Sequence, residues 1–168
     1  LFNSGILFAV ICFICYIRHF PSNFLFHTPS HKISFIGNIC SLIAFVGFLG
    51  VLCVPNDLHR IVHLVLMLIA FGGVTLIFLS FGIAGLLSRQ IPRILTYLFL
   101  LLFLGMLSYF FSMVLGPNLF TDKGAHFHIF TQKLGVSFLI IVLDVIGWVT
   151  FRSELQSKVH LKEKSNNA

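Results

Sequence analysis

The stretch LVLMLIAFGGVTLIFLSFGIAGLL, residues 64–87, contains neither a charged side chain nor a proline. As a helix rising 1.5 Å per residue, it is long enough to cross the roughly 30 Å hydrocarbon layer of a membrane. Its apolar residues are continuous instead of alternating, unlike the strands of a transmembrane barrel. An open sheet edge would leave backbone groups unpaired in lipid. The stretch therefore predicts a membrane-spanning helix.

Other apolar segments of the chain have the same character. Of its 168 residues, 58% are hydrophobic and only 10% are charged, whereas about a quarter are charged in a typical soluble domain. We therefore predict an all-α fold class, a polytopic transmembrane helical bundle over residues 1–151 with a polar cytoplasmic tail over 152–168. The five predicted spans cover about residues 1–17, 33–54, 58–87, 94–115 and 134–151.

Lysine and arginine divide unevenly between the two sides of this predicted bundle. Eight lie in the tail and in the loops after the first and third spans, and three lie on the other side, namely Arg60, Lys123 and Lys133. The positive-inside rule then places the C-terminus in the cytoplasm. Residue 1 would lie outside, so we expect a further helix upstream and six spans in the full protein.

The formal net charge of +6 does not indicate a nucleic-acid partner. The basic residues are spread over short loops and the tail, without a recognition module. We expect membrane lipids as partners and no nucleic acid. Small residues four apart, such as Gly37 and Ser41 or Ala84 and Ser88, predict close contacts between helices of the same chain.

A group of histidines and acids on the predicted outer side is the first candidate site. His59 and His63 are four residues apart and therefore share a helix face. The loop before the last span carries Asp122, His126 and His128. Imidazoles and a carboxylate are zinc ligands, and bound zinc can activate water. The five residues therefore predict a zinc site in a metal-dependent membrane hydrolase.

A structural interpretation of the same residues stays open. Asn56 and Asp57 are natural caps for the helix that follows them. Histidines at a membrane surface also hydrogen-bond lipid headgroups or loop carbonyls. The spacing matches no tight metal motif such as H-E-x-x-H.

Asp144 is the second candidate, because it lies near the centre of the last predicted span. A carboxylate there costs about 2.5–3.5 kcal/mol on insertion scales, so it should face the bundle or be protonated. The expected partners are Thr75, Ser108, Tyr109 and Ser112. A proton or ion relay in a small transporter is one interpretation, and an interhelical hydrogen bond is the other.

No catalytic residue is predicted. The chain has no Gly-rich phosphate loop, nucleophile elbow or kinase motif, and the sequence does not decide whether it is an enzyme. The expected function is a lipid-embedded module that binds or senses a lipid or apolar ligand at its outer side. The hydrolase and the transporter are the alternatives.

Three short features occur in order along the chain: Phe2-Asn3-Ser4-Gly5, then Val54-Pro55-Asn56-Asp57 leading into His59 and His63, then Gln132-Lys133-Leu134 before Asp144 and Trp148. Together they resemble a bacterial membrane family known as domain of unknown function 998. The resemblance implies a six-helix inner-membrane protein and no particular activity. The chain departs from the pattern at Gln132, where the family often has an acid. A more distant similarity is to the six-helix damage-regulated autophagy modulator-like proteins.

Overall fold

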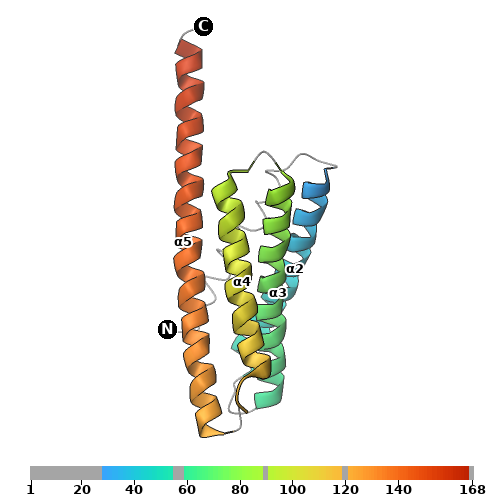
Figure 1. Cartoon of the computed structure of the whole chain (residues 1–168). Coiled ribbons are helices and arrows are strands. Elements are labelled where there is room, and N and C mark those ends of the chain that lie inside the picture. The colour runs from blue at the N-terminus through green and yellow to red at the C-terminus, as the bar shows by residue number, and fades with distance from the viewer. Residues whose placement is uncertain (1–27, 55–58, 89–90, 119–120, 167–168) are drawn as a thin grey trace.

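Within the residues that it describes, the computed structural model contains four helices and no strand. The helices are α2 (Pro29–Cys53), α3 (Arg60–Leu87), α4 (Arg93–Leu115) and α5 (Asp122–Asn166) (Figure 1). All four are long and apolar enough to cross a membrane. The structure describes residues 28–54, 59–88, 91–118 and 121–166, with side chains up to residue 152. The predicted first span, residues 1–17, lies outside them.

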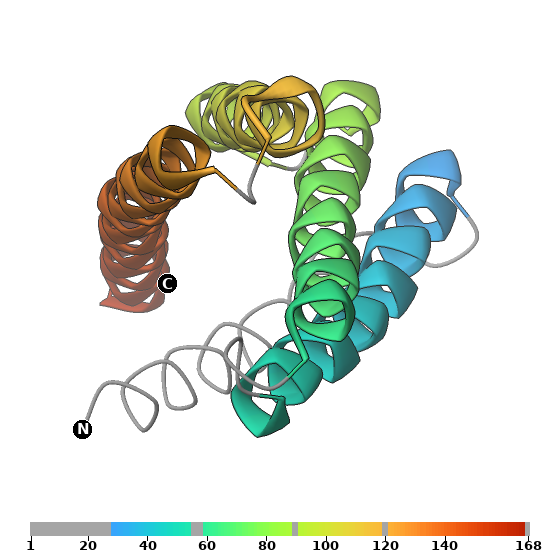
Figure 2. The same cartoon turned by 90° about the horizontal axis from the view of Figure 1, so that it is seen from below.

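Successive helices run in opposite directions and each packs against the next one along the chain. The packed pairs are α2 with α3, α3 with α4, and α4 with α5. Seen along the helix axes, the four follow one another around an open arc (Figure 2). In the most apolar stretch of α3, 50% of the residues are buried, compared with 11% in that of α5. Helix α3 is therefore the centre of the bundle, and α5 is the helix least covered by the others.

The contact between α2 and α3 depends on small side chains. The buried face of α2 carries only serine, glycine and alanine. A Cβ atom added to Gly47 would lie 2.7 Å from the backbone nitrogen of Ala70, so the two backbones meet there without room for a methyl group. Gly37 and Ser41 are buried on the same face, which confirms the predicted close contact between helices of one chain.

Large aromatic and aliphatic side chains fill the contact between α3 and α4. Phe78, Phe81 and Phe99 are almost completely buried. The rings of Phe81 and Phe99 meet edge to face, with centroids 5.7 Å apart, and those of Phe71 and Tyr109 do so at 4.9 Å. This geometry favours contact between the positive edge of one ring and the negative face of the other.

The last helix differs from its predicted span at both ends. It begins at Asp122 instead of about 134 and continues to Asn166 instead of ending at 151. At its start, the Gly124 amide donates a hydrogen bond to Thr121 Oγ1 at 3.1 Å, which is a typical N-cap contact. Polar residues end an apolar run of sequence without ending the helix. A span predicted from hydropathy alone is therefore shorter than α5. Beyond residue 152, α5 projects past the other helices (Figure 1).

Candidate functional site

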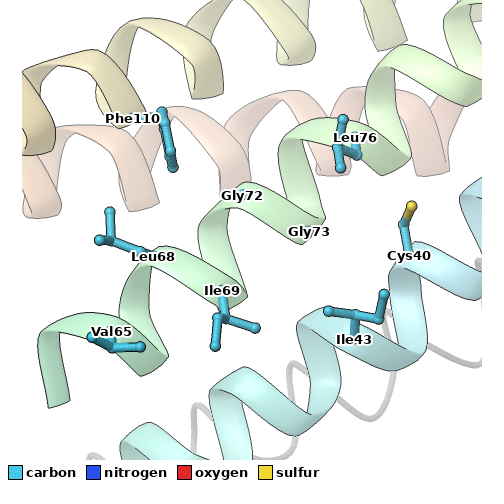
Figure 3. A pocket seen from close by; sticks show the side chains of 9 residues that line it. All are labelled: Cys40, Ile43, Val65, Leu68, Ile69, Gly72, Gly73, Leu76 and Phe110. Atoms are coloured by element: carbon cyan, nitrogen blue, oxygen red, sulfur yellow. The ribbon is translucent and has the colours of Figure 1, made fainter. Parts of the chain in front are cut away.

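One depression in the described bundle is an apolar groove of about 350 Å³. Its floor is Gly72 and Gly73 of α3, and larger side chains of three helices stand around it (Figure 3). The Cys40 thiol is the only side-chain heteroatom that lines it. Such a surface can pack against an apolar group but offers no charged or strongly polar contact. The other lining residues are Ile43, Val65, Leu68, Ile69, Leu76 and Phe110.

A second, smaller depression is a pocket of about 140 Å³ with both polar and apolar walls. It lies where α3 begins, α4 ends and α5 begins, which we call the pocket end of the bundle. Its α3 residues, at 60, 63, 64 and 67, lie on a different face of that helix from the groove residues at 65, 69, 72 and 76. The two depressions are therefore separate. The pocket is lined by Arg60, His63, Leu64, Met67, Tyr109, Met113, Ala125, His128, Ile129 and Gln132.

Polarity changes along this pocket. Arg60 and His63 belong to the first turn of α3 and His128 to the second turn of α5, so they lie toward the outer opening. Tyr109 is 6% exposed and lies at the inner end, beside Gly135. Methionine, leucine and isoleucine side chains and the Gln132 amide line the part between them. The pocket therefore has a basic end, with Arg60 and two histidines, and a mainly apolar remainder that includes Gln132 and Tyr109.

His63 links the end of α2 to the start of α3. Its Nδ1 lies 2.7 Å from the carbonyl oxygen of Val54, the residue that follows α2. A carbonyl can only accept, so Nδ1 carries the hydrogen and donates. In the neutral ring Nε2 is then the nitrogen with a free lone pair. The carbonyl would otherwise be one of the unpaired acceptors at a helix end.

His128 makes the equivalent contact between α4 and α5. Its Nε2 lies 2.9 Å from the carbonyl oxygen of Pro117, two residues beyond the end of α4. By the same reasoning Nε2 donates, and Nδ1 is the acceptor of the neutral ring. Both pocket histidines therefore hydrogen-bond backbone carbonyls, as the structural interpretation of the sequence expected.

The five predicted zinc ligands do not form one group. His63 and His128 line the same pocket, whereas His59, Asp122 and His126 are exposed. Because residues 122–128 are helical instead of a loop, Asp122 and His126 share one face, and His128, two residues on, points to a different one. In the described part of the chain no three His, Cys, Asp or Glu side chains are placed to hold a metal. Zinc-dependent hydrolysis stays a prediction.

The start of α3 also differs from the prediction. The N-cap position is His59, whose side chain makes no capping hydrogen bond. Its carbonyl accepts from the His63 amide at 2.9 Å. Asn56 and Asp57, the predicted caps, lie outside the described residues.

Asp144 is exposed and lies away from the rest of the bundle. Among the described helices, α5 packs only against α4, through a face that includes the buried Val142 and Ile146. Two residues from each, Asp144 falls on the opposite face. No hydrogen bond or ion pair joins it to the described part of the chain. Asp144 therefore does not face the four described helices, and the other alternative, a protonated carboxyl group, stays a prediction.

The expected partners of Asp144 lie at another depth. Tyr109 is beside Gly135, nine residues from Asp144 and therefore roughly 13 Å away along α5. Ser108 is next to Tyr109, and Ser112 lies one turn closer to the pocket end. Thr75 and Ser112 donate hydrogen bonds to carbonyls of their own helices.

No sequence pattern indicated that Arg60, Tyr109 and Gln132 belong to one pocket. The spacing of Arg60 and His63, three residues apart, was the available signal that they share a face. Their meeting with Tyr109 and Gln132 depends on the register between helices, which no local pattern specifies.

No protein-family model, curated protein or solved structure matches the chain. The resemblance to the domain of unknown function 998 stays a prediction, and the roles of the pocket residues rest on their geometry.

Proposed function

We propose that this chain is a multi-pass membrane protein that binds an anionic phospholipid by its headgroup in the pocket lined by Arg60, His63 and His128. The observation that carries the proposal is the polarity of this pocket, with an arginine at the opening and mainly apolar side chains inside. A phospholipid has the same order of groups, since its charged phosphate lies next to its acyl chains.

The chemistry of the opening suits a phosphate. Guanidinium groups bind phosphate oxygens through paired N–H donors. Lys123 and Lys133 are exposed on α5 near the same end and add positive charge, against one described acid there, Asp122. These charges favour an anionic headgroup over a zwitterionic one.

The size of the pocket limits what it can hold. About 140 Å³ is below the 300–1,000 Å³ of a typical small-molecule site. The pocket therefore accepts a headgroup or the first part of a chain, while the rest of the lipid stays in the bilayer. This supports binding of a membrane lipid more than binding of a soluble metabolite.

The placement in the membrane follows the charge distribution. With the four described helices as spans, the pocket end has the fewer lysines and arginines and lies outside the cytoplasm. The C-terminal end of α5 is then cytoplasmic. The bacterial inner membrane is the location that the family resemblance implies.

Binding of phosphatidylglycerol by the purified full chain in mild detergent tests the proposal. Native mass spectrometry measures how much lipid stays bound, with phosphatidylcholine as the zwitterionic comparison. We expect Arg60→Gln to weaken phosphatidylglycerol binding about 5- to 10-fold, because it removes the phosphate-binding charge at the opening. Arg93→Gln is the matched control, since Arg93 is exposed at the opposite end of the bundle.

Two results would contradict the proposal. One is equal retention of the two lipids by the wild-type chain, and the other is an equal effect of the two arginine substitutions. Soluble glycerophosphate serves as a competitor. If it displaces the lipid at equal concentration, the site binds a free phosphate compound and does not use the acyl chains.

A further inference from the structure

The exposed face of α5 that carries Asp144 combines small and polar residues with large apolar ones, among them Ile141, Trp148 and Phe151. Ser137, Ile140, Asp144 and Gly147 are spaced by three, four and three residues, so they lie on one side of the helix. All four are exposed. Two of them are small and one is a carboxylic acid. Polar and small residues together are typical of contacts between helices in membranes.

The depth of Asp144 makes lipid an unsuitable neighbour. In the register between α4 and α5, Gly105 of α4 faces Phe138 of α5. Asp144, six residues further along α5, is then near the level of Leu100, about seven residues inside α4. Seven residues correspond to roughly 10 Å. With Arg93 at the membrane edge, the carboxylate is within the hydrocarbon layer, where acids pair with another group.

Gly147 provides room for a partner on this face. A Cβ atom added to it would meet no atom within 4 Å among the described residues. Gly105 and Gly135, by contrast, are in contact with Phe138 and Tyr109. Gly147 therefore has no packing role within the described bundle, and its missing side chain allows another helix to approach one turn from Asp144.

The charge of Asp144 indicates which kind of helix fits. In the four described helices, lysine and arginine occur near helix ends and, within α5, at Lys133 and Arg152. None of them is level with Asp144, so a second copy of these helices would offer Asp144 no basic side chain at that depth. A partner with a lysine or arginine at that depth would instead neutralise it.

We propose that the α5 face formed by Ser137, Ile140, Asp144 and Gly147 docks a transmembrane helix that carries a lysine or arginine at the depth of Asp144. The partner's ammonium or guanidinium group pairs with the carboxylate, and its backbone approaches over Gly147. The inference rests on the membrane placement proposed above but does not depend on the lipid pocket. That pocket lies at the other end of the described bundle.

A synthetic probe helix tests this docking. The probe is a Leu/Ala transmembrane peptide with one lysine about 10 Å from one hydrocarbon edge, and its matched control has leucine at that position. Full-length chain with a donor dye at its C-terminus and probe with an acceptor dye are reconstituted in phosphatidylcholine vesicles. Energy transfer measures association. We expect the lysine probe to associate about 5- to 30-fold more strongly than the leucine probe, the range of polar interhelical contacts in model peptides.

Substitutions distinguish the effect of the Asp144 carboxylate on association from the effect of the space at Gly147. Asp144→Asn should reduce association of the lysine probe to the level of the leucine probe, and Asp144→Glu should retain most of it. Gly147→Leu should weaken it by blocking the approach. Leu104→Ala is the control, because Leu104 is exposed on α4 and away from this face.

Each outcome decides the inference. Equal association of the two probes, or no effect of Asp144→Asn, overturns it. So does energy transfer between two copies of the chain that depends on Asp144, or exclusion of the probe by another segment of the same chain. Co-flotation with the vesicles is measured in the same samples. A chain that fails to float refutes the membrane placement, whereas a chain that floats without lysine-dependent transfer refutes only the docking.

Discussion

His63 and His128 show how one residue can hold two helices together at the pocket end. Each ring donates to a backbone carbonyl just beyond the end of the preceding helix, at 2.7 Å for His63 and 2.9 Å for His128. The His63 bond is partly buried and the His128 bond is exposed. Because an acceptor that is shielded from water loses more when its donor is removed, we expect His63 to contribute more to stability than His128.

Replacing His63 tests this role. His63→Phe keeps most of the ring volume but removes the donor to the Val54 carbonyl, so we expect a loss of about 1–3 kcal/mol in the free energy of unfolding. Denaturant titration in detergent micelles measures it. His126→Phe is the control, because His126 is exposed and no hydrogen bond to its ring is observed. Equal effects of the two substitutions would contradict the assignment.

The residues were easier to identify from the sequence than their partners were. The spacing of His59 and His63 predicts a shared helix face, whereas in the structure His59 is the N-cap residue before α3 and only His63 lines the pocket. The Val54 carbonyl, however, lies nine residues before His63 in the chain, and their contact depends on the course of the turn between two helices. Asp144 was recognised as an unusual residue for the same local reason, yet its side of α5 is decided by packing against α4.

Among the elements, α3 and α4 begin and end within two residues of their predictions, and α2 begins four residues early. The ends of these helices could be predicted because long apolar runs stop at proline or at charged residues. The start of α5 was missed because residues 122–133 are polar enough to resemble a loop. Their helical conformation instead begins with the Thr121 cap.

A proline in this segment distinguishes a helix from a loop. Phe130 is 65% exposed, so Phe130→Pro removes little packing but breaks a backbone hydrogen bond and clashes with the preceding turn. We expect a loss of about 3 kcal/mol or more, measured as a lower Tm in detergent. Phe130→Ala should have a much smaller effect. A proline variant as stable as the alanine variant would show that residues 122–133 do not form a helix in solution.

At the scale of the whole molecule, the order of the helices follows from short connections, which place consecutive helices side by side. The open arc does not follow from any local pattern. It results from the small-residue face of α2, which meets α3 closely, and from α5, which among the described helices packs only against α4. The two ends of the arc leave apolar side chains exposed, and water would be a poor solvent for them.

Lipid is the expected solvent for these exposed apolar faces, and both proposed functions require it. Ile39 of α2 and Leu104 of α4 are 46% and 59% exposed and lie in the middle of their helices. Nitroxide spin labels at these two positions, in chain reconstituted into vesicles, report whether oxygen or a water-soluble nickel chelate reaches them more readily. We predict more collisions with oxygen than with nickel at both positions, and the reverse for a label at the exposed Asn118. Preferential access of nickel to positions 39 and 104 would contradict the membrane placement on which the proposed functions depend.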